Sequence, residues 1–234
     1  MTQTYSTMEI SCIATGSSGN CYLVKLGGST IILDAGIAIG RISSAVNLNN
    51  VAFAFISHSH NDHCQSALNL KKKGVQVVYG NSYPTFTKIS NTLEFGGNLE
   101  AWVFPVQHDK TVPCGGIIIR YQNECLIYAI DFIKCEYDLS IFKPTAVMVE
   151  CNYSKDLLEN ADVYTQRQLA THMDIVGCSL FLKTLDLSKC EQIVLMHNSD
   201  RFGDPVLAGV LISREFGIKT NVCKKNGGMD EYGQ

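Results

Sequence analysis

Two adjoining stretches decide the fold: the apolar run Val51-Ala-Phe-Ala-Phe-Ile-Ser57 and the polar run His58-Ser59-His60-Asn61-Asp62-His63. A continuous apolar run of this length suits a strand that is buried on both faces of a sheet. Such a strand needs helices outside the sheet, so the run favours an α/β fold. The polar run places three imidazoles and a carboxylate within six residues of loop.

The polar run is suited to bind cations. Neutral imidazole nitrogen and carboxylate oxygen are the ligands that Zn²⁺ and similar divalent ions prefer. The alternating spacing lets His58 and His60 face one ion while Asp62 and His63 face another. The alternative, a turn of unrelated polar residues or a chance histidine patch, is the less favoured interpretation.

Outward from this point, strand-like runs alternate with helical stretches. Strands are expected at residues 9–14, 21–26, 29–34, 51–57, 75–79, 99–104, 117–121, 126–130, 146–150 and 193–196. Gly27-Gly28 predicts a tight hairpin, and helices are expected at Cys64–Lys73 and His172–Leu185. We therefore expect an α/β fold, an αββα sandwich of two mixed β-sheets flanked by helices. No composition break marks a linker, so residues 1–234 are predicted to form one domain.

Composition narrows the class of protein. Of the 234 residues 46% are apolar, and 19 Lys plus Arg against 22 Asp plus Glu give a formal charge of −3. These values are typical of a folded protein and disfavour a long duplex-binding surface, which usually needs a strong basic excess. The first basic residue is Lys25, and no apolar stretch reaches the roughly 18 residues needed to cross a bilayer. We expect a soluble cytoplasmic protein without membrane contact, whose ten scattered cysteines are small buried residues.

The pattern H-x-H-x-D-H after an apolar strand resembles the signature of metallo-β-lactamase-fold hydrolases. The other signature positions find matches in order: Asp34 after Leu33, His108 after Gln107, Asp131 after Ile130 and His197 after Met196. Five of the six histidines thus fall on positions that bind metal in that family.

The resemblance implies two divalent ions, and mixed imidazole and carboxylate ligation fits Zn²⁺ or Mn²⁺. The implied ligands are His58, His60 and His108 for one ion, Asp62, His63 and His197 for the other, and Asp131 between them. Asp34 would lie behind these ligands and fix their imidazoles by hydrogen bonds, and Glu150 is expected in the same supporting shell.

His172, the sixth histidine, points to a particular branch of this family. Glu150, His172 and His197 resemble late motifs of the β-CASP nucleases and ribonuclease J, although the chain has no room for the β-CASP insertion. The loop Thr15-Gly16-Ser17-Ser18-Gly19-Asn20 is similar to the Ser-Gly-Ser-Ser-Gly-Asn opening of the single-domain exonuclease-like branch called YycJ or VicX. The residues after both late histidines depart from that branch, which puts the transfer of its DNA substrate in doubt.

The same positions suggest roles in catalysis. A hydroxide that bridges the two ions would be the nucleophile, and Asp62 would orient it and accept its proton. His172 would protonate the leaving oxygen or hold a phosphate, unless it only caps a helix or is a buried polar residue. Donors for a phosphate are expected at Ser17, Ser18, Asn20, Asn152, Ser199 and Arg201.

We predict a metal-dependent hydrolase, a phosphodiesterase that cleaves nucleic-acid ends in the manner of an exonuclease. One alternative is a phosphodiesterase of small cyclic or linear nucleotide signals, which suits the near-neutral charge. A thioester, lactone or β-lactam hydrolase and a metal-stabilised binding module without catalysis are further alternatives on the same fold. The sequence leaves the native metal, the cleavage polarity and the oligomeric state open.

Overall fold

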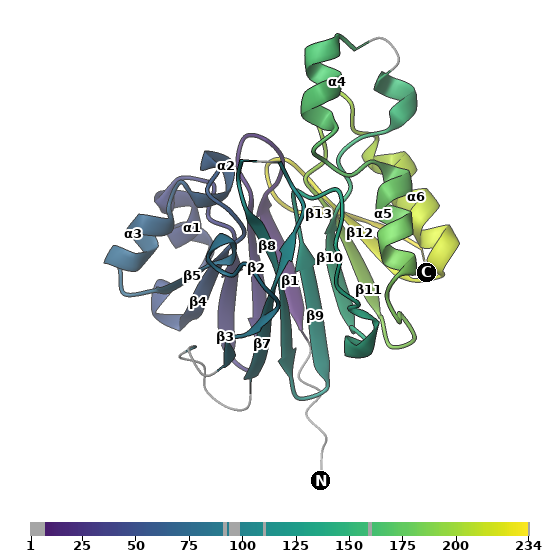
Figure 1. Ribbon diagram of the computed structural model, residues 1–234. Helices are drawn as coiled ribbons and strands as arrows, with labels where there is room; N and C mark the ends of the chain where they lie inside the picture. The colour runs from purple at the N-terminus through teal and green to yellow at the C-terminus, as the bar shows by residue number, and fades with distance from the viewer. Residues whose placement is uncertain (1–7, 91–92, 94–98, 110, 159–160, 234) are drawn as a thin grey trace.

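Two mixed β-sheets lie face to face at the centre of the computed structural model, which describes residues 8–90, 93, 99–109, 111–158 and 161–233 (Figure 1). The first sheet has the spatial order β1 (Glu9–Ala14), β2 (Cys21–Leu26), β3 (Ser29–Leu33), β4 (Val51–Ile56) and β5 (Gln76–Tyr79). The second has the order β13 (Met229–Tyr232), β12 (Lys219–Cys223), β11 (Gln192–Met196), β10 (Ala146–Glu150), β9 (Glu124–Ala129), β8 (Cys114–Tyr121), β7 (Leu99–Val106) and β6 (Thr87–Lys88).

Helices cover the outer faces of both sheets, so the predicted αββα sandwich is confirmed. The α-helices are α1 (Ile39–Ala45), α2 (Asn61–Cys64), α3 (Ala67–Lys72), α4 (Val163–Leu169), α5 (Ile175–Lys183) and α6 (Pro205–Phe216). Short 3₁₀ turns are η1 (Leu48–Asn50), η2 (Gly80–Ser82), η4 (Ser140–Phe142) and η5 (Lys155–Leu158). No helix in the described ranges is long and apolar enough to cross a membrane.

The core has three layers of apolar side chains. The central layer fills the space between the sheets and includes Tyr22, Phe53, Phe55 and Tyr128, which are fully buried. The outer layers pack α1 and α3 on the first sheet, and α5 and α6 on the second. Burial on both faces explains why β4 reads as a continuous apolar run.

Several expected elements differ in extent. Within the stretch Cys64–Lys73 only Ala67–Lys72 forms a helix, α3, because Ser66 leaves the helical pattern to bond the chain that follows β3. Its backbone N–H donates to Ala35 O over 2.8 Å and its hydroxyl donates to Ile37 O over 2.6 Å. The helix expected from His172 begins at Ile175, where the Asp174 carboxylate caps the first turn. Helices α1, α2, α4 and α6 and strands β6, β12 and β13 were not predicted.

The carboxyl ends of the central strands meet at one end of the sandwich. In the first sheet β3 runs parallel to β4, and in the second β9, β10 and β11 are parallel. Directly beyond these ends lie three residues with left-handed backbone, Asp34 (φ 58°), Asp131 (φ 50°) and His197 (φ 56°). Such a conformation costs of order 1–3 kcal/mol for a non-glycine residue and is concentrated at functional sites.

A close backbone contact joins the two segments that follow β3 and β4. A Cβ atom on Gly36 would lie 1.6 Å from the carbonyl oxygen of Asp62, so only glycine fits there. We expect Gly36→Ala to lower the free energy of unfolding by ~1–3 kcal/mol or more, because backbone has to move. Urea denaturation measures this change.

Gly40→Ala is the matched control for this substitution. Gly40 is exposed in α1, and its added Cβ would meet no atom within 4 Å, so we expect stability to stay unchanged or rise slightly. Equal urea midpoints for the two variants would refute the proposed backbone contact at Gly36.

Candidate metal centre

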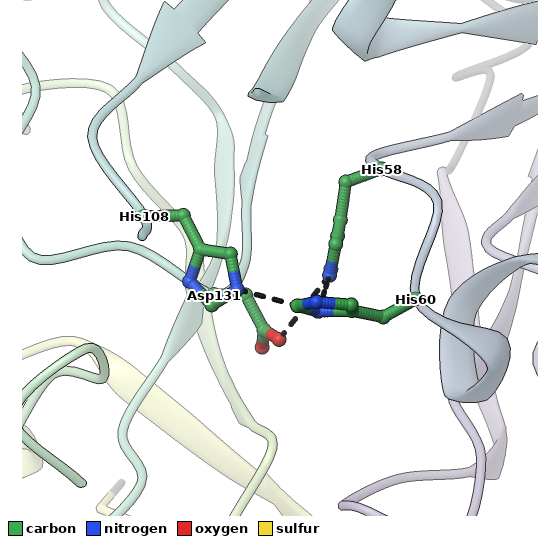
Figure 2. Close-up of side chains that lie close together, drawn as sticks. All are labelled: His58, His60, His108 and Asp131. Carbon is green, nitrogen blue, oxygen red and sulfur yellow. Dashed lines mark hydrogen bonds and ion pairs between the residues drawn. The ribbon is translucent and has the colours of Figure 1, made fainter. Parts of the chain in front are cut away.

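Four side chains from separate parts of the chain point toward one another at the carboxyl ends of the strands (Figure 2). They are His58 and His60 after β4, His108 after β7 and Asp131 after β9. His58 Nε2 lies 2.8 Å from His60 Nδ1, and His108 Nε2 lies 3.4 Å from the same atom. Asp131 Oδ2 is 3.7 Å from His58 Nε2. One ligand atom from each residue lies within 4.8 Å of the others, close enough to bind one metal ion.

A second cluster borders the first. It contains Asp62 and His63 of α2 and His197, which follows β11 directly. Asp62 Oδ2 is 3.4 Å from His63 Nε2 and 3.7 Å from His197 Nε2. Because Asp131 Oδ2 also lies 3.2 Å from His63 Nε2, this carboxylate touches both clusters. The structure therefore brings together all the residues that were expected to bind metal.

Glu150 and His172 lie beside the second cluster. His172 Nδ1 is 2.6 Å from Glu150 Oε1, and the His172 ring stacks on that of His197 with centroids 5.1 Å apart. Glu150 is fully buried, and its Oε2 accepts a hydrogen bond of 2.9 Å from the Phe132 N–H. Its Oε1 lies 3.3 Å from His197 Nδ1, which agrees with the supporting position expected for Glu150. Together with Asp131, these residues form a third group of close ligand atoms.

The buried carboxylate of Asp34 supports the loop that carries the ligands. Its Oδ1 accepts a hydrogen bond of 2.7 Å from the Ser57 N–H, and its Oδ2 accepts one of 2.6 Å from the Tyr128 hydroxyl. The same Oδ2 lies 2.7 Å from His63 Nδ1, which leaves Nε2 of that ring facing the second cluster. This geometry agrees with the expectation that Asp34 fixes an imidazole.

His197 is held on its backbone and on its ring. The Asn152 amide donates to His197 O over 2.7 Å, and its nitrogen lies 2.8 Å from His197 Nδ1. The backbone N–H of His197 donates to the Thr15 hydroxyl over 2.7 Å. Asn152 therefore has a positioning role here in addition to any contact with substrate.

Opposite charges dominate the electrostatics of the two clusters. Burial, reinforced by His63, lowers the pKa of His58 to about 2, so this imidazole is neutral. Burial also opposes protonation of His197, but Asp131 and the neighbouring carboxylates outweigh it and raise its pKa to about 10. The pKa of His63 is raised in the same way by Asp131 and Asp34. In return, His197 and His63 outweigh burial and hold the pKa of Asp131 well below its ordinary value.

These charges fit a divalent cation. In the described part of the chain, the buried carboxylates of Asp34, Asp131 and Glu150 form no ion pair with Lys or Arg, only with imidazoles. Buried charges in proteins are paired or coordinate metals. His197 Nε2 is moreover buried without a hydrogen-bond partner, 3.7 Å from Asp62 Oδ2. A cation bound here would balance the carboxylates and take the lone pairs that the imidazoles present.

A hollow of about 320 Å³ lies next to His172 and His197. Four of the six residues expected to contact substrate line it, namely Ser17, Asn152, Ser199 and Arg201. The Arg201 guanidinium packs 5.0 Å from the Phe202 ring centroid, which contributes another part of the wall. Thr165 and Leu169 of α4 complete the opposite side.

Ser18 and Asn20 were also expected to donate to a phosphate, and neither residue lines this hollow. Ser18 is exposed, whereas Asn20 is fully buried. The Asn20 amide donates to Gly16 O over 3.2 Å, and its nitrogen lies 3.1 Å from His63 Nε2. Its side chain therefore holds the loop against the ligand histidine.

Three hydroxyl groups that hold the site were not predicted from the sequence. Ser57 and Tyr128 bond Asp34, and Thr15 bonds His197. A signal for Tyr128 was available, because a buried tyrosine in an apolar strand needs a partner for its hydroxyl. No comparable signal exists for Thr15, whose partner lies 182 residues away in the sequence.

The positions of the histidines and carboxylates and the architecture of the two sheets agree with the sequence pattern. Residues 14–96 match the sequence profile of the family described as the Metallo-beta-lactamase superfamily. The chain is a metallo-β-lactamase-fold protein. The match over residues 14–96 agrees with the superfamily expected from the H-x-H-x-D-H pattern, and the fold expected with it is confirmed.

Known structures share this fold. The structure of YhfI from Bacillus subtilis superposes with a TM-score of 0.70 at 16% identity, covering 97% of this chain and 99% of that one. Human tRNase Z, short form, gives a TM-score of 0.59 at 12% identity over 82% of this chain and 93% of the other. A curated relative, exodeoxyribonuclease YycJ of Bacillus anthracis, is 27% identical over 45% of this chain. The match spans only 48% of that relative, about half its length.

The metallo-β-lactamase-fold centre should depend on the carboxylate behind it. We expect Asp34→Asn to weaken metal binding by roughly 10–100-fold, because an amide no longer holds His63 Nδ1 as a charged acceptor does. Isothermal titration calorimetry of the chelator-treated protein with Zn²⁺ or Mn²⁺ measures the change in metal affinity.

Asp230→Asn serves as the control, since Asp230 is exposed on β13 and pairs with Lys224. Its metal affinity should equal that of the wild type. Unchanged affinity in Asp34→Asn as well would remove Asp34 from the support of the metal centre.

Proposed function

We propose that the protein is a dinuclear metal-dependent phosphodiesterase that acts on nucleic-acid ends. The observation that carries the proposal is the position of Asp131, whose Oδ2 is 3.2 Å from His63 Nε2 and 3.7 Å from His58 Nε2. A carboxylate in reach of both clusters would help to hold two divalent ions, one at each cluster. Zn²⁺ or Mn²⁺ would be held by His58, His60 and His108 on one side, by Asp62, His63 and His197 on the other, and by Asp131 between them.

When bound, such ions polarise a phosphoryl oxygen and lower the pKa of water toward neutrality. The chain itself supplies the proton acceptor. Burial raises the pKa of Asp62, but His197 and His63 outweigh burial and lower this pKa below its ordinary value. Asp62 is therefore an ionised carboxylate at neutral pH, placed to orient a water molecule and to accept its proton.

His172 is the candidate proton donor. Burial opposes its protonation, but the adjacent Glu150 and Asp131 outweigh burial and raise the pKa of His172. Glu150 holds Nδ1 of the ring, which leaves the other ring nitrogen free to protonate a leaving oxygen. The position of His172 in the wall of the hollow supports this role over a purely structural one.

The hollow beside His172 favours a terminal unit of the substrate. Its volume of about 320 Å³ lies at the small end of the range of roughly 300–1,000 Å³ for small-ligand sites. The Arg201 guanidinium and the hydroxyls of Ser17 and Ser199 are suited to phosphate oxygens. The formal charge of −3 does not favour a long basic track, so we propose that the strand end is bound.

The same observations favour one second candidate, a phosphodiesterase of small nucleotide signals. A substrate of that size would be held by the hollow alone, without any track for a strand. The two candidates differ in their dependence on salt, since a strand that contacts several charged groups is released steeply as salt is added. A nucleotide held in the hollow should show little dependence.

A panel of three substrates tests the reaction class. With Zn²⁺ or Mn²⁺ present we expect hydrolysis of bis-p-nitrophenyl phosphate but not of a thioester or a cephalosporin. Asp62→Asn should reduce the rate by about 100-fold or more, since the proton acceptor is lost, while Asp230→Asn should match the wild type. Hydrolysis of only the thioester or the cephalosporin would replace the proposal by carbonyl chemistry.

A second test addresses His172 through the leaving group. His172→Ala should slow cleavage of an oligonucleotide, whose alkoxide leaving group needs a proton, by roughly 100-fold or more. Cleavage of a p-nitrophenyl ester should fall far less, because p-nitrophenolate leaves without protonation. Equal losses with both leaving groups would assign His172 a structural role.

A further inference from the structure

Helices α5 and α6 carry large apolar side chains on the face that points away from the sheets. Their exposed fractions are 57% for Val176, 58% for Leu180, 59% for Val206, 37% for Leu207 and 44% for Leu211. These are half of the large hydrophobic side chains found exposed among the described residues. Figure 1 shows α5 and α6 as the outer layer on the right of the molecule. We call the outer face formed by these five residues the α5–α6 face.

Both helices are apolar on two sides. Their inner sides contribute Cys178, Leu182, Ala208 and Ile212 to the layer packed on the second sheet. A surface helix normally presents a polar face to water, whereas the outer side of these helices carries five exposed apolar side chains beside Lys183, Arg214 and Glu215. Contiguous apolar patches on soluble proteins mark interaction sites. The pattern of α5 and α6 therefore indicates that something covers their outer side.

The α5–α6 face contains a groove. A groove of about 530 Å³ runs between the two helices, with Val176 and Leu180 on one side and Leu211 on the other. Glu215 ties the helices together, because its carboxylate accepts from the Ser179 hydroxyl over 2.7 Å and pairs with Lys183 over 2.5 Å. The two helices therefore present one connected surface to a partner.

The sequence of α6 adds matching charges. Asp204, Leu207, Leu211 and Arg214 are spaced by three, four and three residues, so they lie along one side of the helix. The spacing of these four residues is the same in both directions from Gly209. The residue at one end of the series is acidic and the residue at the other end is basic. In the described part of the chain, neither Asp204 nor Arg214 forms an ion pair.

We propose that the α5–α6 face is the interface of a two-fold symmetric homodimer, with α6 antiparallel to α6 of a second copy. In this pairing Asp204 faces Arg214 of the partner subunit, and Leu207 faces Leu211 of the partner subunit. Each contact occurs twice, as an isologous interface requires. An unrelated partner would not need a pattern that matches its own reverse, so the symmetry favours a second copy as the occupant. The inference is independent of the reaction proposed above.

Sedimentation equilibrium of the full chain tests the dimer. We expect the wild type to be a dimer at micromolar concentration. Leu211→Glu should raise the dissociation constant by about 100-fold or more, because two carboxylates would be buried against apolar side chains. Leu68→Glu is the matched control: Leu68 is 66% exposed on α3, so its substitution should leave the dimer intact. Circular dichroism confirms that both variants are folded.

A second series tests the antiparallel pairing. Arg214→Glu should raise the dissociation constant by about tenfold or more, since it places two like-charge pairs in the interface. Adding Asp204→Asn should recover part of this loss, because asparagine removes the repulsion and still caps α6. Lys71→Glu on α3 should have no effect.

Three results would overturn the proposal. They are a monomeric wild type throughout the micromolar range, a dimer that Leu211→Glu leaves unchanged, and an Arg214→Glu variant that Asp204→Asn does not improve. The first two would reject the dimer interface, and the last would reject the antiparallel pairing.

Discussion

The burial of carboxylates without lysine or arginine is the constraint on which the site depends. Asp34, Asp131 and Glu150 are each at most 2% exposed, and imidazoles supply their only ion-pair partners in the described ranges. An unbalanced carboxylate in such surroundings would be very costly. Protons on the imidazoles, or metal ions in their place, must therefore accompany folding of this end of the molecule. Charge balance, more than the shape of any one loop, keeps these residues together.

The two sheets make that concentration of charge feasible. Parallel strands deliver their carboxyl ends to one edge, so residues from distant parts of the sequence meet without long connecting loops. Asp34 links the sheets directly, since it bonds Ser57 at the end of the first sheet and Tyr128 of the second. The apolar layer between the sheets fixes the distance between them. Because Asp34 bonds both sheets and His63, this distance also determines where the His63 ring lies. Packing and ligand geometry are therefore coupled through one carboxylate.

Sequence patterns predicted the strands and the metal ligands better than the helices and the substrate contacts. Strong local signals, such as the apolar run before His58 and the glycine pair Gly27-Gly28, identified β4 and the β2–β3 hairpin. Helix α6 also has local signals, Asp204-Pro205 at its start and Gly217 at its end, which its unusual apolar composition obscured. The supporting role of Asn20 depends on contacts between distant segments, and no local pattern contains that information.

The left-handed backbone at Asp34, Asp131 and His197 restricts how the chain can vary. Each residue follows a strand whose side chains alternate between the two faces of its sheet. Insertion of a single residue into β3, β9 or β11 would turn the carboxylate or imidazole beyond it toward the opposite face. Length changes are therefore tolerable at the far ends of these strands, where hairpins and loops reverse the chain, and not along the strands themselves. For protein engineers, the loops at the end of the sandwich opposite the metal centre can be shortened or lengthened, whereas the strands that lead to the metal centre must keep their length.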